Sequence, residues 1–284
     1  MCVSMAPAVF TGTKIYVGLI KRPDVTDESS VPDARVLMYQ NEAMSMGGMP
    51  NAMLLHIPTD TEMSQANFID MSNAAKVLDD MAEVLTPRTR SVMLGADSIS
   101  AKGMVQVFES GMFHIVLADN AEDIPSVLNE VPIEKRPHVN PELLAFYQKN
   151  FPTGYKFVLA CFNSREFFKA DPIALWYIPS EETKDYVVYP ALDCHTGNAP
   201  DIYENVPIDH FLFFSNLYAP MGTRVRYSRN VPSEVAPFLP EEITGKEFTG
   251  RMLNGDFRFL LSTMRNGIFP QVERHFPGVV SMNG

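Results

Sequence analysis

Short apolar runs separated by turn-forming residues constrain the fold of this chain more than any other feature. They cover residues 35–41, 51–57, 103–109, 112–118, 155–162, 172–178, 186–192 and 208–214. Each run has the length and the composition of a strand, and Ser110-Gly111 can join two of them as a hairpin. Strands that follow one another through short turns pair antiparallel, so the sequence predicts mainly antiparallel sheets.

Helical patterns are fewer and lie between groups of strands. We expect helices at 73–85, 123–130, 140–151 and 257–266. In Asn140-Pro141-Glu142, asparagine caps the helix, proline needs no partner for a missing N–H, and glutamate favours the positive end of the helix dipole. The expected fold class is α+β, with helices packed on antiparallel sheets. We expect one large domain over 1–284, in which 229–284 is a proline-punctuated arm ending in a short helix.

Composition excludes several classes of function. The formal charge of -11 over 284 residues repels polyanions, which argues against general nucleic-acid binding. Cys2, Cys161 and Cys194 are too few and too scattered for a disulfide framework or a four-thiolate zinc site. With no secretory leader and no apolar run of about 18 residues, we expect a soluble, cytoplasmic protein that does not enter membranes.

The first residues carry one candidate for catalysis. Small side chains at Cys2 and Ser4 alternate with apolar ones at Val3 and Met5, which predicts a strand. We expect a tight turn at 11–13 and a second strand at 14–20. Removal of Met1 would give Cys2 a free α-amine that titrates near pH 8 and can accept the thiol proton, so that one residue supplies both nucleophile and base. The alternative is that Cys2 is a small buried side chain at the start of a strand.

This segment resembles the N-terminal-nucleophile hydrolases of the choloylglycine and penicillin-acylase kind. The resemblance rests on Cys2 after Met1, on Arg22 and Asp24 near the end of the next strand, and on 48–51 with 56–58. It implies a hydrolase of carbon–nitrogen amide bonds, in which Cys2 attacks the carbonyl and Arg22 and Asp24 orient the cysteine and hold the substrate. The substrate would be a small-molecule amide.

A second group of reactive side chains lies in the middle of the chain. Asp193, Cys194 and His195 end one strand-like run, and Asp209-His210 begins the next. If the strand continues, Asp193 and His195 share a face. Two histidines and two carboxylates suit a divalent zinc or iron ion at His195 and His210, and Cys194 beside a histidine suits a thiolate nucleophile. A structural turn is the third interpretation. No other cofactor is predicted.

A non-catalytic function is also consistent with the sequence. The methionine-rich segment 38–53 and the proline-rich segment 229–240 can serve as contact surfaces of a structural or assembly protein. Its partners would then be proteins, including further copies of the same chain in a homo-oligomer.

Overall fold

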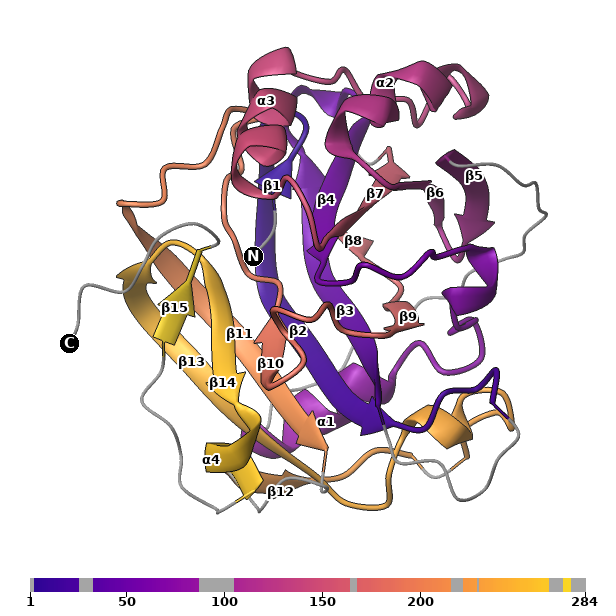
Figure 1. Cartoon of the computed structure of the whole chain (residues 1–284), viewed down its shortest axis with the longest axis vertical. Coiled ribbons are helices and arrows are strands. Elements are labelled where there is room, and N and C mark those ends of the chain that lie inside the picture. Colours follow the sequence, from indigo (N-terminus) through magenta and orange to yellow (C-terminus); the bar gives the residue numbers. More distant parts are fainter. Residues whose placement is uncertain are drawn as a thin grey trace.

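The computed structural model of the chain describes residues 3–25, 33–86, 105–163, 168–215, 222–228, 230–265 and 273–276. The fold is α+β with mainly antiparallel sheets, as the sequence predicts (Figure 1). The α-helices are α1 (Val77–Leu85), α2 (Ile124–Val127), α3 (Pro141–Asn150) and α4 (Leu261–Arg265). Among the described residues, no helix has both the length and the apolar character needed to span a membrane.

The described strands form three sheets. The first sheet contains β1 (Val3–Ser4), β4 (Asn51–Ile57), β7 (Lys156–Phe162), β6 (Phe113–Ala118) and β5 (Val105–Ser110). The second contains β12 (Thr223–Val225), β13 (Ile243–Leu253), β11 (Asn205–Ser215), β2 (Ala8–Ile20), β3 (Ala34–Ser45) and β8 (Phe168–Lys169), with β9 (Ile173–Tyr177) also paired to β3. The third contains β10 (Tyr186–Tyr189), β14 (Asp256–Leu260) and β15 (Glu273–His275). Between these described strands, only β11 and β2 pair in parallel.

The first two sheets pack face to face, and their central strands, such as β3, β4 and β7, are buried on both faces. Along β4, Met53 and Leu55 point into the core between the sheets, whereas Leu54 points into a second core beneath α2 and α3. Along β3, Leu37 joins the inter-sheet core and Met38 joins a third core that includes α1. The order of layers is therefore helix, sheet, sheet, helix, with α2 and α3 on one side and α1 on the other (Figure 1). Strands buried on both faces read as nearly continuous apolar runs, which is why so many were visible in the sequence.

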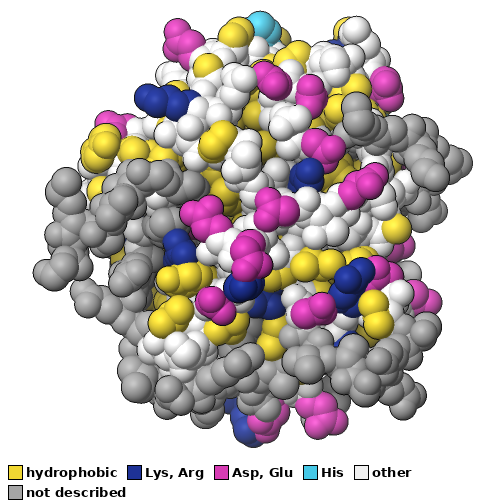
Figure 2. Space-filling model, viewed as in Figure 1, with side chains coloured by type: hydrophobic (Ala, Val, Ile, Leu, Met, Phe, Trp, Pro, Cys, Tyr) yellow, Lys and Arg dark blue, Asp and Glu magenta, His cyan; other side chains and the backbone are white. Residues whose placement is uncertain are grey.

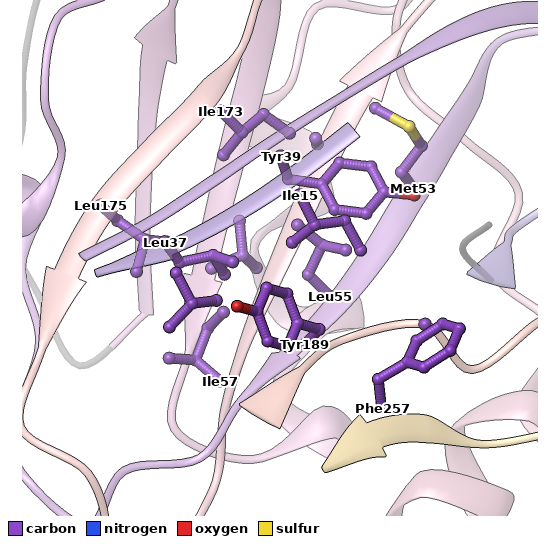
Figure 3. Close-up of a cluster of buried hydrophobic side chains, with 14 of the residues drawn as sticks. Ile15, Leu37, Tyr39, Met53, Leu55, Ile57, Ile173, Leu175, Tyr189 and Phe257 are labelled. Atoms are coloured by element: carbon purple, nitrogen blue, oxygen red, sulfur yellow. The ribbon is translucent and has the colours of Figure 1, made fainter. Parts of the chain in front are cut away.

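The third sheet closes one side of the inter-sheet core. Tyr189 of β10 and Phe257 of β14 are fully buried with Ile15 of β2 and Leu55 of β4 in the same cluster (Figure 3). The Tyr189 hydroxyl donates a hydrogen bond of 3.0 Å to the carbonyl of Phe213. The third sheet is thereby tied to the second, and it brings the β13–β14 turn to the edge of the sandwich.

Two local expectations are wrong. The turn expected at 11–13 does not form: β2 runs on from Ala8 to Ile20, and a bulge between Thr11 and Lys14 absorbs Gly12, whose φ is +59°. The helix expected over 257–266 begins as β14 instead, because Phe257 and Phe259 are buried on alternate positions. Of the described residues in this range, 261–265 are helical. Within 229–284, β13 thus contributes a paired strand of the second sheet.

Charged side chains are spread over the face of the molecule that Figure 2 shows. On the face shown in Figure 2, acidic side chains lie among apolar and basic ones, and the basic side chains do not gather into one patch. The absence of general nucleic-acid binding remains a prediction from the net charge.

Candidate functional site

The first described residues are held between β4 and a segment near residue 194. On one side, Val3 and Ser4 pair with Leu54 and Met53 of β4. On the other side, Val3 forms a parallel bridge with Cys194, and the amide of Ser4 donates to the carbonyl of Cys194 at 2.9 Å. The strand that follows Cys2 in the sequence therefore lies directly beside the second candidate cluster.

Two further contacts fix this arrangement. The amide of Ala8 donates to the carbonyl of His195 at 2.9 Å. Asn51 accepts from the amide of Ala6 and donates to its carbonyl, both at 3.0 Å. Gly197 has a φ of +79°, and a Cβ there would lie 2.7 Å from the carbonyl oxygen of Met5. Glycine is required at 197 both by the left-handed backbone and by this close approach.

The side chains of the 193–195 segment alternate between two faces. Cys194 packs against the core beneath α2 and α3, and its Sγ lies 3.3 Å from the Thr196 hydroxyl. Asp193 and His195 point the other way: Asp193 Oδ1 lies 2.8 Å from His195 Nε2, and the imidazole packs edge-on against Phe10 at 4.9 Å between centroids. The Asp193–His195 contact has the distance of an ion pair but lacks the alignment of a hydrogen bond.

His210 and Asp209 reach the same region from β11. His210 pairs with Thr13 across the β11–β2 ladder, and its side chain is only 1% exposed, with the ring 5.6 Å from that of Phe257. Burial lowers the pKa of His210 well below its ordinary value, and nearby Arg274 and His195 also disfavour its charge, so the ring is neutral at pH 7. Asp209 Oδ2 accepts from the amide of Gly12 at 2.7 Å, which anchors the bulge of β2.

Arg274 adds a positive charge next to these groups. Its guanidinium lies 4.4 Å from the centroid of the Phe257 ring, and Nη2 donates to the carbonyl of Ala191 at 3.1 Å. Burial lowers the pKa of Arg274 to about 10, although Asp256 and Asp193 oppose this effect, so the group stays charged at neutral pH. Within the described residues, its buried Nε and Nη1 have no hydrogen-bond partner, and neither does the buried Thr13 hydroxyl. Buried polar atoms without a protein partner are often satisfied by a ligand or by water.

Side chains at the turn between β13 and β14 form hydrogen bonds with the backbone of residues 191–193. Asn254 and Asp256 are each only 2% exposed, and their side chains accept hydrogen bonds from the amides of Ala191, Leu192 and Asp193. Asp256 Oδ2 also lies 2.7 Å from Nε2 of the buried His56. No motif or periodicity in the sequence singles out Asn254, Asp256 or Arg274 as site residues. In the sequence, Asn254-Gly255-Asp256 carries only the signal of a turn.

The predicted site residues fall into two places. Cys2 lies outside the described residues. Arg22 and Asp24 form an exposed ion pair, in which Nη2 and Oδ2 are 2.7 Å apart. The pair follows Ile20, the last residue of β2, whereas Ala8 lies at the other end of β2, the end near β1. The 13 residues of β2 span roughly 40 Å at about 3.3 Å each, so this pair is remote from β1 (Figure 1).

The middle cluster is partly assembled. Asp193 lies 2.8 Å from His195, and His195 is close enough to His210 to disfavour its charge, whereas Asp209 binds the amide of Gly12 and Cys194 is turned to the opposite face. Among the described parts of the chain, no group of three or more His, Cys, Asp or Glu side chains is arranged to hold a metal ion. What the cluster offers is a carboxylate–imidazole pair, a neutral buried imidazole and a guanidinium.

No protein-family model, curated protein or solved structure matches this chain. The resemblance of its first residues to N-terminal-nucleophile hydrolases remains a prediction from the sequence.

Proposed function

We propose that the protein hydrolyses carbon–nitrogen amide bonds with Cys2 as the nucleophile, after removal of Met1. The observation that carries this proposal is the position of β1 against Cys194 and His195. Cys2 is bonded to Val3, and consecutive Cα atoms are about 3.8 Å apart. We therefore propose that the two candidate groups, which are far apart in the sequence, act as one site.

The faces of the paired segments support the same conclusion. Val3 and Cys194 share the core beneath α2 and α3, as expected of residues that lie opposite each other. Asp193 and His195 are therefore on the other face. Ser4, the residue after Val3 on β1, is expected on the face of Asp193 and His195.

In the proposed reaction, Cys2 Sγ attacks the carbonyl carbon while the α-amine of Cys2 accepts the thiol proton. The C–N bond then breaks, the amine product leaves with that proton, and water hydrolyses the thioester to a carboxylic acid. We assign to His195, with Asp193 at 2.8 Å, the removal of a proton from the attacking water and the return of that proton to the released Cys2 thiolate. The exposed Arg22–Asp24 pair takes no part in this scheme.

The buried, unpaired polar atoms provide an independent argument. Arg274 Nε, Arg274 Nη1 and the Thr13 hydroxyl have no hydrogen-bond partner within the described residues. His210 links the two residues, because it pairs with Thr13 and lies close enough to Arg274 to be affected by its charge. A bound substrate amide would supply a carbonyl oxygen for such donors. Charge that develops on that oxygen in the transition state is stabilised most strongly where donors are already fixed and water is excluded.

Intact mass of the purified protein and alkylation of its thiols test the proposal. We expect Met1 to be absent and iodoacetamide to label Cys2 at least tenfold faster than Cys194, a half-buried thiol on the opposite face. Cys2→Ala should abolish this fast phase and Cys194→Ala should leave it intact, with buried Cys161 unlabelled in both. Retention of Met1 would eliminate the mechanism, because the amine of Cys2 would then be part of a peptide bond.

The alternative of an assembly protein keeps one supporting observation. Within the methionine-rich segment, Met38 and Met53 are core residues, whereas Met46 and Met49 are 52% and 61% exposed. The proline-rich segment instead buries Val235 in the core that includes α1. If Met46 and Met49 form a contact surface, Met46→Lys with Met49→Lys should convert an oligomer to monomer in light scattering. If the wild-type protein is a monomer in light scattering, assembly of the chain with copies of itself is excluded.

A further inference from the structure

The segment that carries Asp193 and His195 has almost no regular secondary structure. From 190 to 204 it runs as coil and turns, apart from the single bridge at Cys194. Yet Ala191, Leu192 and Asp193 are 1%, 2% and 8% exposed. Buried amides that are not in a ladder need other partners, and in this segment side chains supply them.

Asn254 and Asp256 provide those partners. Asp256 Oδ1 accepts from the amides of Ala191 and Leu192 at 2.9 and 3.1 Å. Asn254 Oδ1 accepts from the amide of Asp193 at 2.8 Å, and its Nδ2 donates to the carbonyl of Asp193 at 2.7 Å. Both backbone polar groups of Asp193 are thus held by one side chain.

The same turn is itself fixed from two directions. The amide of Asn254 donates to the carbonyl of Glu204, and its Nδ2 also donates to the carbonyl of Asp201 at 3.0 Å, which closes the other end of the segment. On the opposite side, Asp256 Oδ2 contacts Nε2 of His56, whose ring lies among the rings of Tyr147, Phe151 and Tyr155.

The geometry points to Asn254 and Asp256 as positioning residues, which set the backbone of 191–193 so that the Asp193–His195 pair faces the N-terminal strand. This inference rests on the proposed function, because the proposed function assigns proton transfer to the Asp193–His195 pair. Neither side chain contacts His195 in the structure, so each acts through the backbone of the segment. A carboxylate–imidazole pair serves proton transfer only when its orientation is maintained by surrounding groups.

Conservative and non-conservative variants separate positioning from stability. Asn254→Ala removes both hydrogen bonds from the Asn254 side chain to the backbone of Asp193. Asp256→Asn keeps an oxygen that can accept from both amides and should retain most of the function. Asn67→Ala is the matched control, since the buried Asn67 also accepts from an amide, that of Ser64, and donates to a carbonyl, that of Trp176, but at a different place in the fold.

The first readout is the rate of Cys2 alkylation by iodoacetamide between pH 5 and 9. In Asn254→Ala we expect at least a tenfold lower rate at pH 7. The pH–rate curve should move toward that of a short peptide beginning Cys-Val-Ser. In Asn67→Ala, the alkylation rate and the pH–rate curve should both equal those of the wild type, even if this variant loses as much thermal stability as Asn254→Ala. A wild-type rate and pH curve in Asn254→Ala would overturn the positioning role.

A second readout does not depend on Cys2. Diethyl pyrocarbonate modifies accessible imidazoles, and the His195 side chain is 21% exposed while that of His210 is 1% exposed. Release of the segment in Asn254→Ala should raise the rate of His195 modification at least fivefold, with His210 and the Asn67→Ala control unchanged. If wild-type Cys2 proves unreactive, the proposed function fails, and this second rate alone decides whether Asn254 fixes His195. An unchanged rate would refute the inference.

Discussion

Replacement of Asp256 by leucine removes one buried acceptor from three donors at once. These donors are the amides of Ala191 and Leu192 and Nε2 of His56, at 2.9, 3.1 and 2.7 Å. A buried donor left without a partner costs about 1–3 kcal/mol. With three donors affected, we expect Asp256→Leu to lower the free energy of unfolding by about 4 kcal/mol, toward the lower end of the summed range. The melting temperature should fall by roughly 12 °C, at about 2–4 °C per kcal/mol for a chain of this size.

A double-mutant cycle isolates the His56–Asp256 contact. His56→Leu alone should cost about 3 kcal/mol, because a buried carboxylate then keeps only its two backbone donors. The double variant should be less destabilised than the sum of the single ones by at least about 1.5 kcal/mol. Urea unfolding followed by the fluorescence of Trp176, the one tryptophan of the chain, measures all four free energies. Additivity within about 0.5 kcal/mol would refute a direct interaction between the two side chains.

The pH dependence of this effect follows from the pKa of Asp256. Burial by itself would raise that pKa, but the contact with His56 and the hydrogen bond from Ala191 hold it below the ordinary value in the folded protein. A carboxyl with a lowered pKa stabilises the fold above its unfolded pKa of about 4 and loses this contribution as the pH falls through the folded value. The difference between wild type and Asp256→Leu should therefore be largest near pH 7 and shrink below about pH 4.

Three further predictions concern single residues near the N-terminal strand. Gly197→Ala should lower the free energy of unfolding in urea by about 1–3 kcal/mol, because φ is +79° and the new Cβ would lie 2.7 Å from the Met5 carbonyl; an unchanged midpoint would contradict so close an approach of the two segments. Burial raises the pKa of Cys161, so that thiol should react with Ellman's reagent at pH 8 only on unfolding, and a fast reaction of native Cys2→Ala, Cys194→Ala protein would show otherwise. Burial lowers the pKa of His210, so the unfolded state takes up an extra proton below about pH 6.5; His210→Phe should therefore lose less stability than the wild type between pH 6.5 and 4.5, and parallel losses would count against a neutral buried ring.

The elements that the sequence predicts well are those set by local patterns. β4 matches the apolar run at 51–57, and Asn140 caps α3 by accepting from the amide of Glu142 at 2.9 Å. The expected turn at 11–13 fails for a non-local reason: Asp209, nearly 200 residues away, binds the amide of Gly12 and stabilises a bulge within a continuous strand. In the sequence, Gly12 gives the same local signal for a tight turn as for a bulge within a continuous strand.

The candidate site also combines features that follow from local sequence patterns with features that depend on distant residues. The alternation of Asp193 and His195 on one face follows from the period of an extended chain, and the structure confirms it. The roles of Asn254 and Asp256 depend on partners that lie about 60 residues away in the chain. Side chains that satisfy irregular backbone carry no periodic pattern. They become visible only when the tertiary fold brings the two segments together.

The position of β1 between two distant segments has a consequence for the order of folding. Ser4 meets Cys194 across 190 residues of sequence, and His56 meets Asp256 across 200. Contacts of such long range close late, because the entropy of loop closure must be overcome before they form. During synthesis, β1 can gain its second neighbour only after Cys194 has left the ribosome, when about two thirds of the 284 residues have been released. If Cys2 is the nucleophile, it gains its reactive surroundings only after that point, so that the shorter nascent chain is protected from its own chemistry.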